Sequence, residues 1–248
     1  MSFPSDHLRD AYERRGELEY ATPAGPPDPV DRKFARITEA LAGVLPCSTF
    51  LDAGCGDGRH LAALPRIGPL PQRIVGVDIA DSILRTARAA TEASGVDAEL
   101  VRANLESMPF PDDTFDVVLC TQVIEHALDP SLALRELRRV LRPEGVLLIS
   151  TDNSNNRVTR ALNAPRRVLV DLLGLRGRRR KVHFPHRAFR KEKFEGLLRD
   201  AGFQLRRSET FRFHVIGAPR LVQALLNRLD ETLPSHTVGD ILLVEAVA

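Results

Sequence analysis

Apolar residues along this chain recur at two spacings, and stretches of one spacing alternate with stretches of the other. Strands are predicted at 49–53, 73–78, 98–102, 115–121, 145–151, 204–211 and 240–247, and the nearly continuous apolar runs FDVVLC and VLLIS are typical of strands covered on both faces. Apolar residues three and four positions apart predict helices at 31–45, 59–64, 82–93 and 131–141. Strand and helix therefore alternate through the first five strands. This alternation is typical of an α/β fold with a doubly wound, mostly parallel sheet of seven strands and helices on both faces.

Three alternating glycines follow the first strand, in the sequence LDAGCGDG. Gly54, Gly56 and Gly58 have no Cβ, so the backbone can adopt positive φ and approach a ligand closely. A dinucleotide-binding loop would read G-x-G-x-x-G, but Arg59 stands where its third glycine would be. Asp57 also puts a carboxylate where a pyrophosphate would lie. The loop therefore favours a cationic cofactor, such as S-adenosylmethionine, over a dinucleotide.

The second strand ends on Asp78, twenty residues after Gly58. A βαβ unit uses this spacing to place an acidic side chain on ribose hydroxyls, and dehydrogenases share it. Asp78 thus indicates nucleoside binding without selecting the cofactor. An NAD-dependent oxidoreductase stays an alternative at this point.

Four motifs in order carry a resemblance to a known family: LDAGCGDG, IVGVDIA, RANLESMPFPDDTFDVVLC, and QVIEHALDP followed by LRELRRVLRPEGVLLIST. On these motifs the chain resembles a class I S-adenosylmethionine-dependent methyltransferase of the small-molecule type, similar to the quinone-biosynthesis enzymes. The resemblance runs from about residue 49 to residue 202. It implies a Rossmann-like fold, S-adenosyl-L-methionine as cofactor, and methyl transfer to a small-molecule or lipid-linked acceptor, with oxygen favoured over nitrogen or carbon.

The resemblance also implies which residues hold the cofactor. The methionine part of the cofactor would lie against the glycine loop, and the ribose would lie at the end of the second strand. The adenine edge would lie after the third strand. The expected cofactor-binding residues are Asp52, Gly54, Cys55, Gly56, Gly58, Asp78, Ile79, Asn104, Leu105 and Thr121. Asn104 stands where relatives usually carry an aspartate, and its amide oxygen can accept the same hydrogen bond from the adenine amino group.

A hydroxyl acceptor would benefit from a general base, and histidine, with an ordinary pKa of about 6.5, suits that task. The candidate catalytic residues are Gln122 and His126 after the fourth strand, and His183 and His186 in VHFPHR. His126 is the best placed, because it follows the carboxyl end of a central strand; a purely structural histidine is the alternative. Some relatives bind a divalent metal here through E-x-x-E-H, but Gln122 replaces the first glutamate, so no metal is expected.

Charge is distributed unevenly along the chain. Segment 157–193 carries thirteen Lys or Arg residues against two acids, a net +11, whereas the whole chain carries +2. We expect residues 1–45 to form an N-terminal helical cap over the cofactor mouth. We expect residues 46–248 to form the methyltransferase domain, with a basic lid insertion at 152–186 and a helical insertion at 212–238.

Apolar stripes at 165–175 and 219–229 predict one helix in each insertion. Cations beside such a stripe are typical of peripheral contact with an anionic membrane. The alternatives are packing of the two stripes on each other, a homodimer formed through these lid helices, or a solvated basic face without a ligand.

Composition adds limits to the function. Three cysteines without a C-x-x-C pair indicate neither a disulfide framework nor a zinc ribbon. A charged N-terminus and the lack of a long apolar run predict a cytoplasmic protein. RNA methylation would use the basic segment on phosphates, but no RNA-binding module is recognisable, so a nucleic-acid partner is not expected. A non-catalytic cofactor-binding protein is the remaining alternative.

Overall fold

The computed structural model describes residues 9–14, 16, 32–156, 161, 164, 186–211, 225, 228 and 239–248. Its strands are β1 (Thr49–Ala53), β2 (Arg73–Asp78), β3 (Glu99–Arg102), β4 (Phe115–Thr121), β5 (Leu141–Asp152), β6 (Gln204–Phe211) and β7 (Ile241–Val247). Its helices are α2 (Arg32–Ala42), α3 (Arg59–Ile67), α4 (Asp81–Ser94), the short 3-10 helix η1 (Ile124–His126), α5 (Pro130–Val140) and α7 (Lys191–Asp200).

The seven strands form one sheet in the order β3-β2-β1-β4-β5-β7-β6. Pairs among the first five strands are parallel, whereas β7 runs antiparallel to both β5 and β6. The predicted doubly wound, mostly parallel sheet is thus confirmed. The chain reverses its direction of winding between β1 and β4, and ligands of open α/β sheets bind at such a switch point, at the carboxyl ends of the strands.

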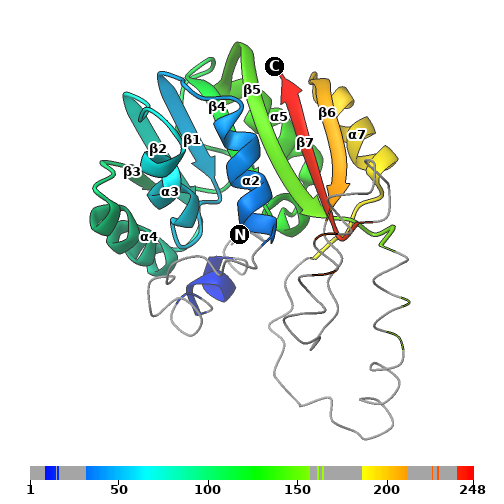
Figure 1. Ribbon diagram of the computed structural model, residues 1–248, viewed down its shortest axis with the longest axis horizontal. Helices are drawn as coiled ribbons and strands as arrows, with labels where there is room; N and C mark the ends of the chain where they lie inside the picture. Colours follow the sequence, from blue (N-terminus) through cyan, green and yellow to red (C-terminus); the bar gives the residue numbers. More distant parts are fainter. Residues whose placement is uncertain are drawn as a thin grey trace, which may run out of the picture.

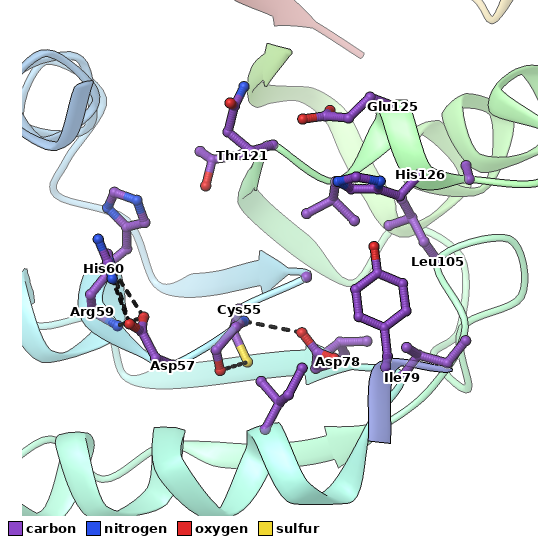
Figure 2. A pocket seen from close by; sticks show the side chains of 18 of the residues that line it. Cys55, Asp57, Arg59, His60, Asp78, Ile79, Leu105, Thr121, Glu125 and His126 are labelled. Atoms are coloured by element: carbon purple, nitrogen blue, oxygen red, sulfur yellow. Dashed lines mark hydrogen bonds and ion pairs between the residues drawn. The ribbon is translucent and has the colours of Figure 1, made fainter. Parts of the chain in front are cut away.

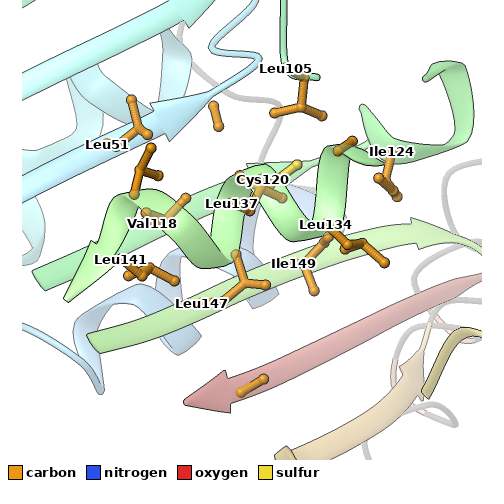
Figure 3. Close-up of a cluster of buried hydrophobic side chains, with 14 of the residues drawn as sticks. Leu51, Leu105, Val118, Cys120, Ile124, Leu134, Leu137, Leu141, Leu147 and Ile149 are labelled. Atoms are coloured by element: carbon orange, nitrogen blue, oxygen red, sulfur yellow. The ribbon is translucent and has the colours of Figure 1, made fainter. Parts of the chain in front are cut away.

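Alternate residues of each central strand supply two separate apolar layers. Leu51, Val118 and Ile149 pack with α5 and α7 on one face of the sheet, while their neighbours Phe50 and Leu119 pack with α2, α3 and α4 on the other. Figure 1 shows this arrangement of helices on the two faces, and Figure 3 shows α5 lying over β1, β4 and β5. Because both faces are covered, the central strands are largely apolar, apart from buried polar residues such as Asp52, and their positions could be predicted from the sequence.

Several bounds differ from the sequence-based expectation. Strand β5 begins at Leu141, directly after α5, rather than at residue 145. Helix α7 was not predicted, because only Phe194 and Leu198 of its ten residues are buried and most of the others are charged or polar. The expected insertion helices at 165–175 and 219–229 lie almost wholly outside the described residues, so the lid and the domain limits stay predictions. In the part of the chain that the structure describes, no helix is long and apolar enough to cross a membrane.

A largely buried ion pair joins α2 to the edge strand β6. Arg36 donates through Nε and Nη2 to the two carboxylate oxygens of Glu209, each at 2.9 Å. The side chains are only 16% and 11% exposed. Arg207 also contacts Glu209, at 2.9 Å. This pair fixes α2 against the sheet, and α2 contributes part of the wall of the cavity described below.

Replacing Arg36 by Leu should therefore destabilise the protein, because Glu209 would keep only Arg207 as a partner for its buried carboxylate. We expect the free energy of unfolding, measured by chemical denaturation, to fall by about 2–3 kcal/mol. The control is Glu39→Gln, since Glu39 also pairs with Arg36 but is 66% exposed; it should change stability by less than about 0.5 kcal/mol. Equal losses in the two variants would contradict a structural role for the Arg36–Glu209 pair.

Candidate active site

A cavity of about 410 Å³ opens at the carboxyl ends of β1, β2, β4 and β5, at the switch point of the sheet. Its size is within the range of small-molecule sites. Figure 2 shows Cys55 and Asp78 along one side of the cavity, with Thr121 and Glu125 across from them. The predicted site residues that line it are Gly54, Cys55, Gly56, Asp78, Ile79, Asn104, Leu105, Thr121, Gln122, His126 and His186. The structure thus brings together eleven of the fourteen predicted residues.

The glycine loop borders this cavity, and its three glycines are required for two different structural reasons. All three have positive φ, of 85° at Gly54, 55° at Gly56 and 76° at Gly58. A Cβ on Gly54 would lie 2.3 Å from Val123, and one on Gly58 would lie 2.9 Å from the Ala87 backbone in α4. A Cβ on Gly56 would meet nothing within 4 Å. Gly54 and Gly58 are therefore needed for packing, whereas Gly56 exposes its backbone to the cavity.

Asp78 is fixed at the end of β2 by the loop. Its Oδ2 accepts a hydrogen bond from Gly56 N–H at 3.1 Å, and its Oδ1 accepts one from Ala80 N–H at 3.2 Å. Burial raises the pKa of Asp78 to about 6, although these N–H groups favour the charged form. Each oxygen keeps a second lone pair, so the carboxylate can still accept two hydroxyl groups.

Two further carboxylates lie under the loop. Asp52 is fully buried in β1, and neither of its oxygens has a hydrogen-bond partner among the described residues. Burial, with the charges of Asp78 and Asp57, raises the pKa of Asp52 to about 8. Asp57 pairs with Arg59 at 2.6 Å. Neither Asp52 nor Gly58 lines the cavity, so any effect of Asp52 on a ligand would act through its charge rather than through contact.

Apolar and amide groups border the cavity beyond Asp78. Ile79 and Leu105 line it from two different loops. The Oδ1 of Asn104 accepts a hydrogen bond from Glu106 N–H at 3.0 Å, which closes a local turn. One lone pair of this oxygen is therefore used by the backbone, and one stays available for a ligand.

The opposite side of the cavity carries proton-accepting groups. Glu125 is 1% exposed and accepts a hydrogen bond from Thr151 Oγ1 at 3.0 Å; burial raises its pKa to about 7. Gln122 has a φ of 57°, rare for a residue with a side chain, and its N–H is held by Ser150 O at 3.0 Å. Its Nε2 is buried without a hydrogen-bond partner within the described ranges. Strained backbone of this kind is typical of functional positions.

Residues from distant parts of the chain complete the wall. The ring of Tyr12 lies edge-on to His126, with centroids 6.0 Å apart, and His126 lies 5.3 Å from His186. Glu13 accepts hydrogen bonds from Asp81 N–H at 2.6 Å and Ser82 N–H at 2.9 Å, and so caps the N-terminus of α4. The helical stretch 9–14 thus contributes Tyr12 to the cavity wall, and the cap expected of residues 1–45 stays a prediction.

His186 contacts a residue that the sequence reasoning missed. Its Nε2 lies 3.1 Å from Asp152 Oδ2, and both residues line the cavity. An acid at the end of an apolar strand had identified Asp78, and the same signal in VLLISTD could have identified Asp152.

The remaining predicted catalytic histidine, His183, lies outside the described residues. No group of three or more potential metal ligands gathers among the residues that are described.

Residues 51–149 match a family described as a methyltransferase domain. This match contains the glycine loop, Asp78, Asn104 and His126, which all contribute to the lining of the cavity. Over this part of its sequence the chain is similar to S-adenosylmethionine-dependent methyltransferases. The resemblance stated from the four motifs is thus confirmed, and the dinucleotide alternative has no support among the relatives.

The relatives of this chain include enzymes of quinone biosynthesis. The ubiquinone/menaquinone biosynthesis C-methyltransferase UbiE of an Enterobacter species is 37% identical over 122 residues, which cover 48% of this chain and 49% of UbiE. The UbiE of an Escherichia coli strain is 35% identical over the same length, again covering 48% of this chain and 49% of UbiE. The chain thus spans about half the length of the curated relatives it matches.

Solved structures agree with the methyltransferase fold over nearly the whole chain. An S-adenosylmethionine-dependent methyltransferase of Thermotoga maritima has a TM-score of 0.63 at 20% identity, and the match covers 97% of this chain and 99% of that one. The cyclase SpnF has a TM-score of 0.61 at 18% identity, covering 98% of this chain and 92% of that one. A cyclase among these neighbours shows that the fold alone does not fix the reaction.

The site fits S-adenosylmethionine on chemical grounds. The cofactor carries positive charges, and the carboxyl groups of Asp52, Asp57 and Asp78 gather at the loop. Burial raises the pKa of Asp52 to about 8, and a nearby cation would favour its ionised form. The open space beside Gly56 allows close approach of a ligand to the backbone. The donor set therefore agrees with the cofactor that the family uses.

Gly58→Ala should mainly lower stability, whereas Gly56→Ala should mainly weaken cofactor binding. Gly58→Ala combines a left-handed backbone with a contact against Ala87, so we expect it to lower the free energy of unfolding by about 2–5 kcal/mol. Gly56→Ala meets no neighbour and should cost only about 1–2 kcal/mol of backbone strain. It should nevertheless weaken S-adenosylhomocysteine binding, measured by calorimetry, at least about tenfold. Wild-type affinity in Gly56→Ala would contradict the close approach of the ligand to this residue.

The raised pKa of Asp78 predicts a pH-dependent affinity for the cofactor. The ionised carboxylate is the better acceptor for hydroxyl groups, and this group becomes protonated as the pH falls through about 6. Affinity for S-adenosylhomocysteine should therefore fall below that pH, approaching tenfold per pH unit. Asp78→Asn should bind weakly at every pH and lose this dependence. If its curve keeps the wild-type shape, another group is responsible for the titration.

Proposed function

We propose that this protein transfers a methyl group from S-adenosylmethionine to a small acceptor that carries an acidic hydroxyl group, such as a phenol or an enol. The observation that carries the proposal is that one cavity joins two chemically different sides. The side formed by Gly56, Asp78 and Ile79 suits a nucleoside with a cationic tail. The side formed by Glu125 and His126 has groups that can accept a proton.

The chain's own residues would hold the cofactor in defined roles. Asp78 would accept hydrogen bonds from the ribose hydroxyls, since both its oxygens keep a free lone pair. Ile79 and Leu105 would pack on the adenine, and Asn104 would accept from the adenine edge. The bound cofactor supplies a methyl group on a positively charged sulfur, which is already a strong donor. The protein therefore needs mainly to position the acceptor and to remove its proton.

Proton removal is where the residues opposite Asp78 would contribute. Burial raises the pKa of Glu125 to about 7, so near neutral pH this carboxyl group can either donate or accept a hydrogen bond. Gln122 also lines this space, and its amide Nε2 is buried without a hydrogen-bond partner among the described residues. The ring of His126 contacts the rings of Tyr12 and His186. An acceptor hydroxyl lying here would have a partner in either protonation state.

The names of the relatives bear on which atom is methylated. The sequence motifs led us to favour oxygen, but the curated relatives are C-methyltransferases of ubiquinone and menaquinone biosynthesis. A phenolate or enolate is nucleophilic at oxygen and at the adjacent carbon, so the same proton removal serves both outcomes. We therefore favour the carbon next to an ionised hydroxyl as the methylated atom. A lipid-linked acceptor at a membrane, and a homodimer, stay predictions from the basic segment.

The proposal can be tested with an isotope-labelled methyl group on S-adenosylmethionine. Purified protein and a small-molecule extract of the source cell should yield a labelled small product, whose NMR shift distinguishes a methyl on carbon from one on oxygen. Asp78→Asn should abolish labelling at low cofactor concentration, and Asp112→Asn, an exposed change away from the cavity, should not. In a parallel reaction with the RNA fraction of the same cell, labelled RNA would support the RNA alternative. Cofactor binding without any labelled product in either reaction would support a non-catalytic protein.

A further inference from the structure

The acceptor side of the cavity contains an ion pair that the proposed function does not yet use. His186 Nε2 lies 3.1 Å from Asp152 Oδ2, and the ring of His186 stands next to that of His126. Asp152 ends β5, whereas His186 follows the segment 157–185. Thirty-four residues of sequence therefore separate two side chains that meet at the cavity wall. The inference below rests on the proposed function.

Hydrogen bonds of the residues that follow His186 hold it beside the cavity. Arg187 N–H donates to Glu125 O at 3.0 Å, and the Arg187 guanidinium donates to the carbonyls of Ala127 and of Leu128, the latter at 3.1 Å. Phe189 N–H donates to Asp152 O at 2.9 Å, so residues 187–189 bridge the loop after η1 to the end of β5. The imidazole is thus presented by a fixed backbone, as an oriented catalytic group requires.

The carboxylate selects one tautomer of the imidazole. An ionised carboxylate can only accept hydrogen bonds, so the Nε2 that faces Asp152 must carry the hydrogen in neutral His186. The other nitrogen, Nδ1, then has its lone pair available. A carboxylate at this position also stabilises the imidazolium that forms when Nδ1 takes a proton.

We propose that His186 is the general base of the methyl transfer and that Asp152 is its positioning residue. The O–H bond of the acceptor breaks, the proton binds His186 Nδ1, and the electron pair stays on the acceptor, which becomes the nucleophile. The side chain of His186 is 52% exposed, so the proton can leave to water after each cycle. Among the described residues, the other titratable side chains of this cavity wall include Tyr12, Lys33, Glu125 and His126, and Arg187 is next to His186 in sequence.

The first test reads the tautomer directly and needs no acceptor. In protein with isotope-labelled histidine, at alkaline pH where imidazoles are neutral, NMR should show His186 with its hydrogen on Nε2. Asp152→Ala should let the Nδ1–H form appear, whereas Asp152→Asn, whose amide oxygen can still accept, should keep the wild-type tautomer. An unchanged tautomer in Asp152→Ala would overturn the pairing.

The second test uses two acceptors that differ in ionisation, catechol and nitrocatechol, whose first hydroxyl ionises near neutral pH. On catechol, we expect kcat to fall about 10²–10³-fold in His186→Gln and about tenfold or more in Asp152→Ala, with KM and S-adenosylhomocysteine affinity little changed. On nitrocatechol, which needs no base once ionised, the losses should shrink to within about threefold. Asp112→Asn is the control on both acceptors, because Asp112 is 73% exposed and outside the cavity.

The outcomes separate this inference from the proposed function. Equal losses on both acceptors would mean that Asp152 and His186 only support the structure, and the base assignment would be wrong while methyl transfer stands. The wild-type protein could fail to methylate catechol, nitrocatechol and any acceptor in the extract. That result would overturn the base assignment together with the proposed function. The tautomer measurement would then still decide whether Asp152 orients His186.

Discussion

The hydrogen bonds that tie the glycine loop to the end of β2 are the constraint on which the site depends. Gly54 N–H and Cys55 N–H both donate to Val77 O, at 2.7 and 2.8 Å, and Gly56 N–H donates to Asp78. These bonds force the chain to turn immediately after β1, which is possible only because the alternate residues adopt positive φ. The turn leads into α3, which packs on one face of the sheet, and it leaves Gly54 and Gly56 beside Asp78 at the cavity.

Burial of acidic groups gives this cavity its chemical character. Asp52, Asp78 and Glu125 all have pKa values raised mainly by desolvation, to about 8, 6 and 7 respectively. Holding such groups without nearby cations costs free energy in the unliganded protein, because the charged forms are poorly solvated. A positively charged cofactor would offset part of this cost by favouring the ionised carboxylates. The same groups would oppose a dinucleotide, whose pyrophosphate is negative.

Sequence patterns predicted what is local and missed what is not. Strands β1, β2, β4 and β6 have the predicted bounds. The first three are short, mostly apolar and largely buried, whereas β6 is mostly polar and is buried only at its last three residues. The cofactor residues follow from motifs in which neighbouring positions act together, as at Gly54 to Gly58. No local pattern encodes the cap that Glu13 places on α4 across 68 and 69 residues, or the pair of Asp152 with His186. Such contacts exist only once the sheet has brought distant strand ends together.

The two sides of the cavity come from different parts of the sequence. The relatives therefore bear on the residues around the glycine loop and not on the identity of the acceptor. The family match spans residues 51–149 and includes the glycine loop, Asp78, Leu105 and His126. It ends before Asp152 and His186, and Tyr12 precedes it. The residues of the match therefore carry the likeness to other methyltransferases, whereas the wall around His186 belongs to this chain's own segments. Because an acceptor would contact that wall, its identity has to be established on this protein and cannot be taken from UbiE.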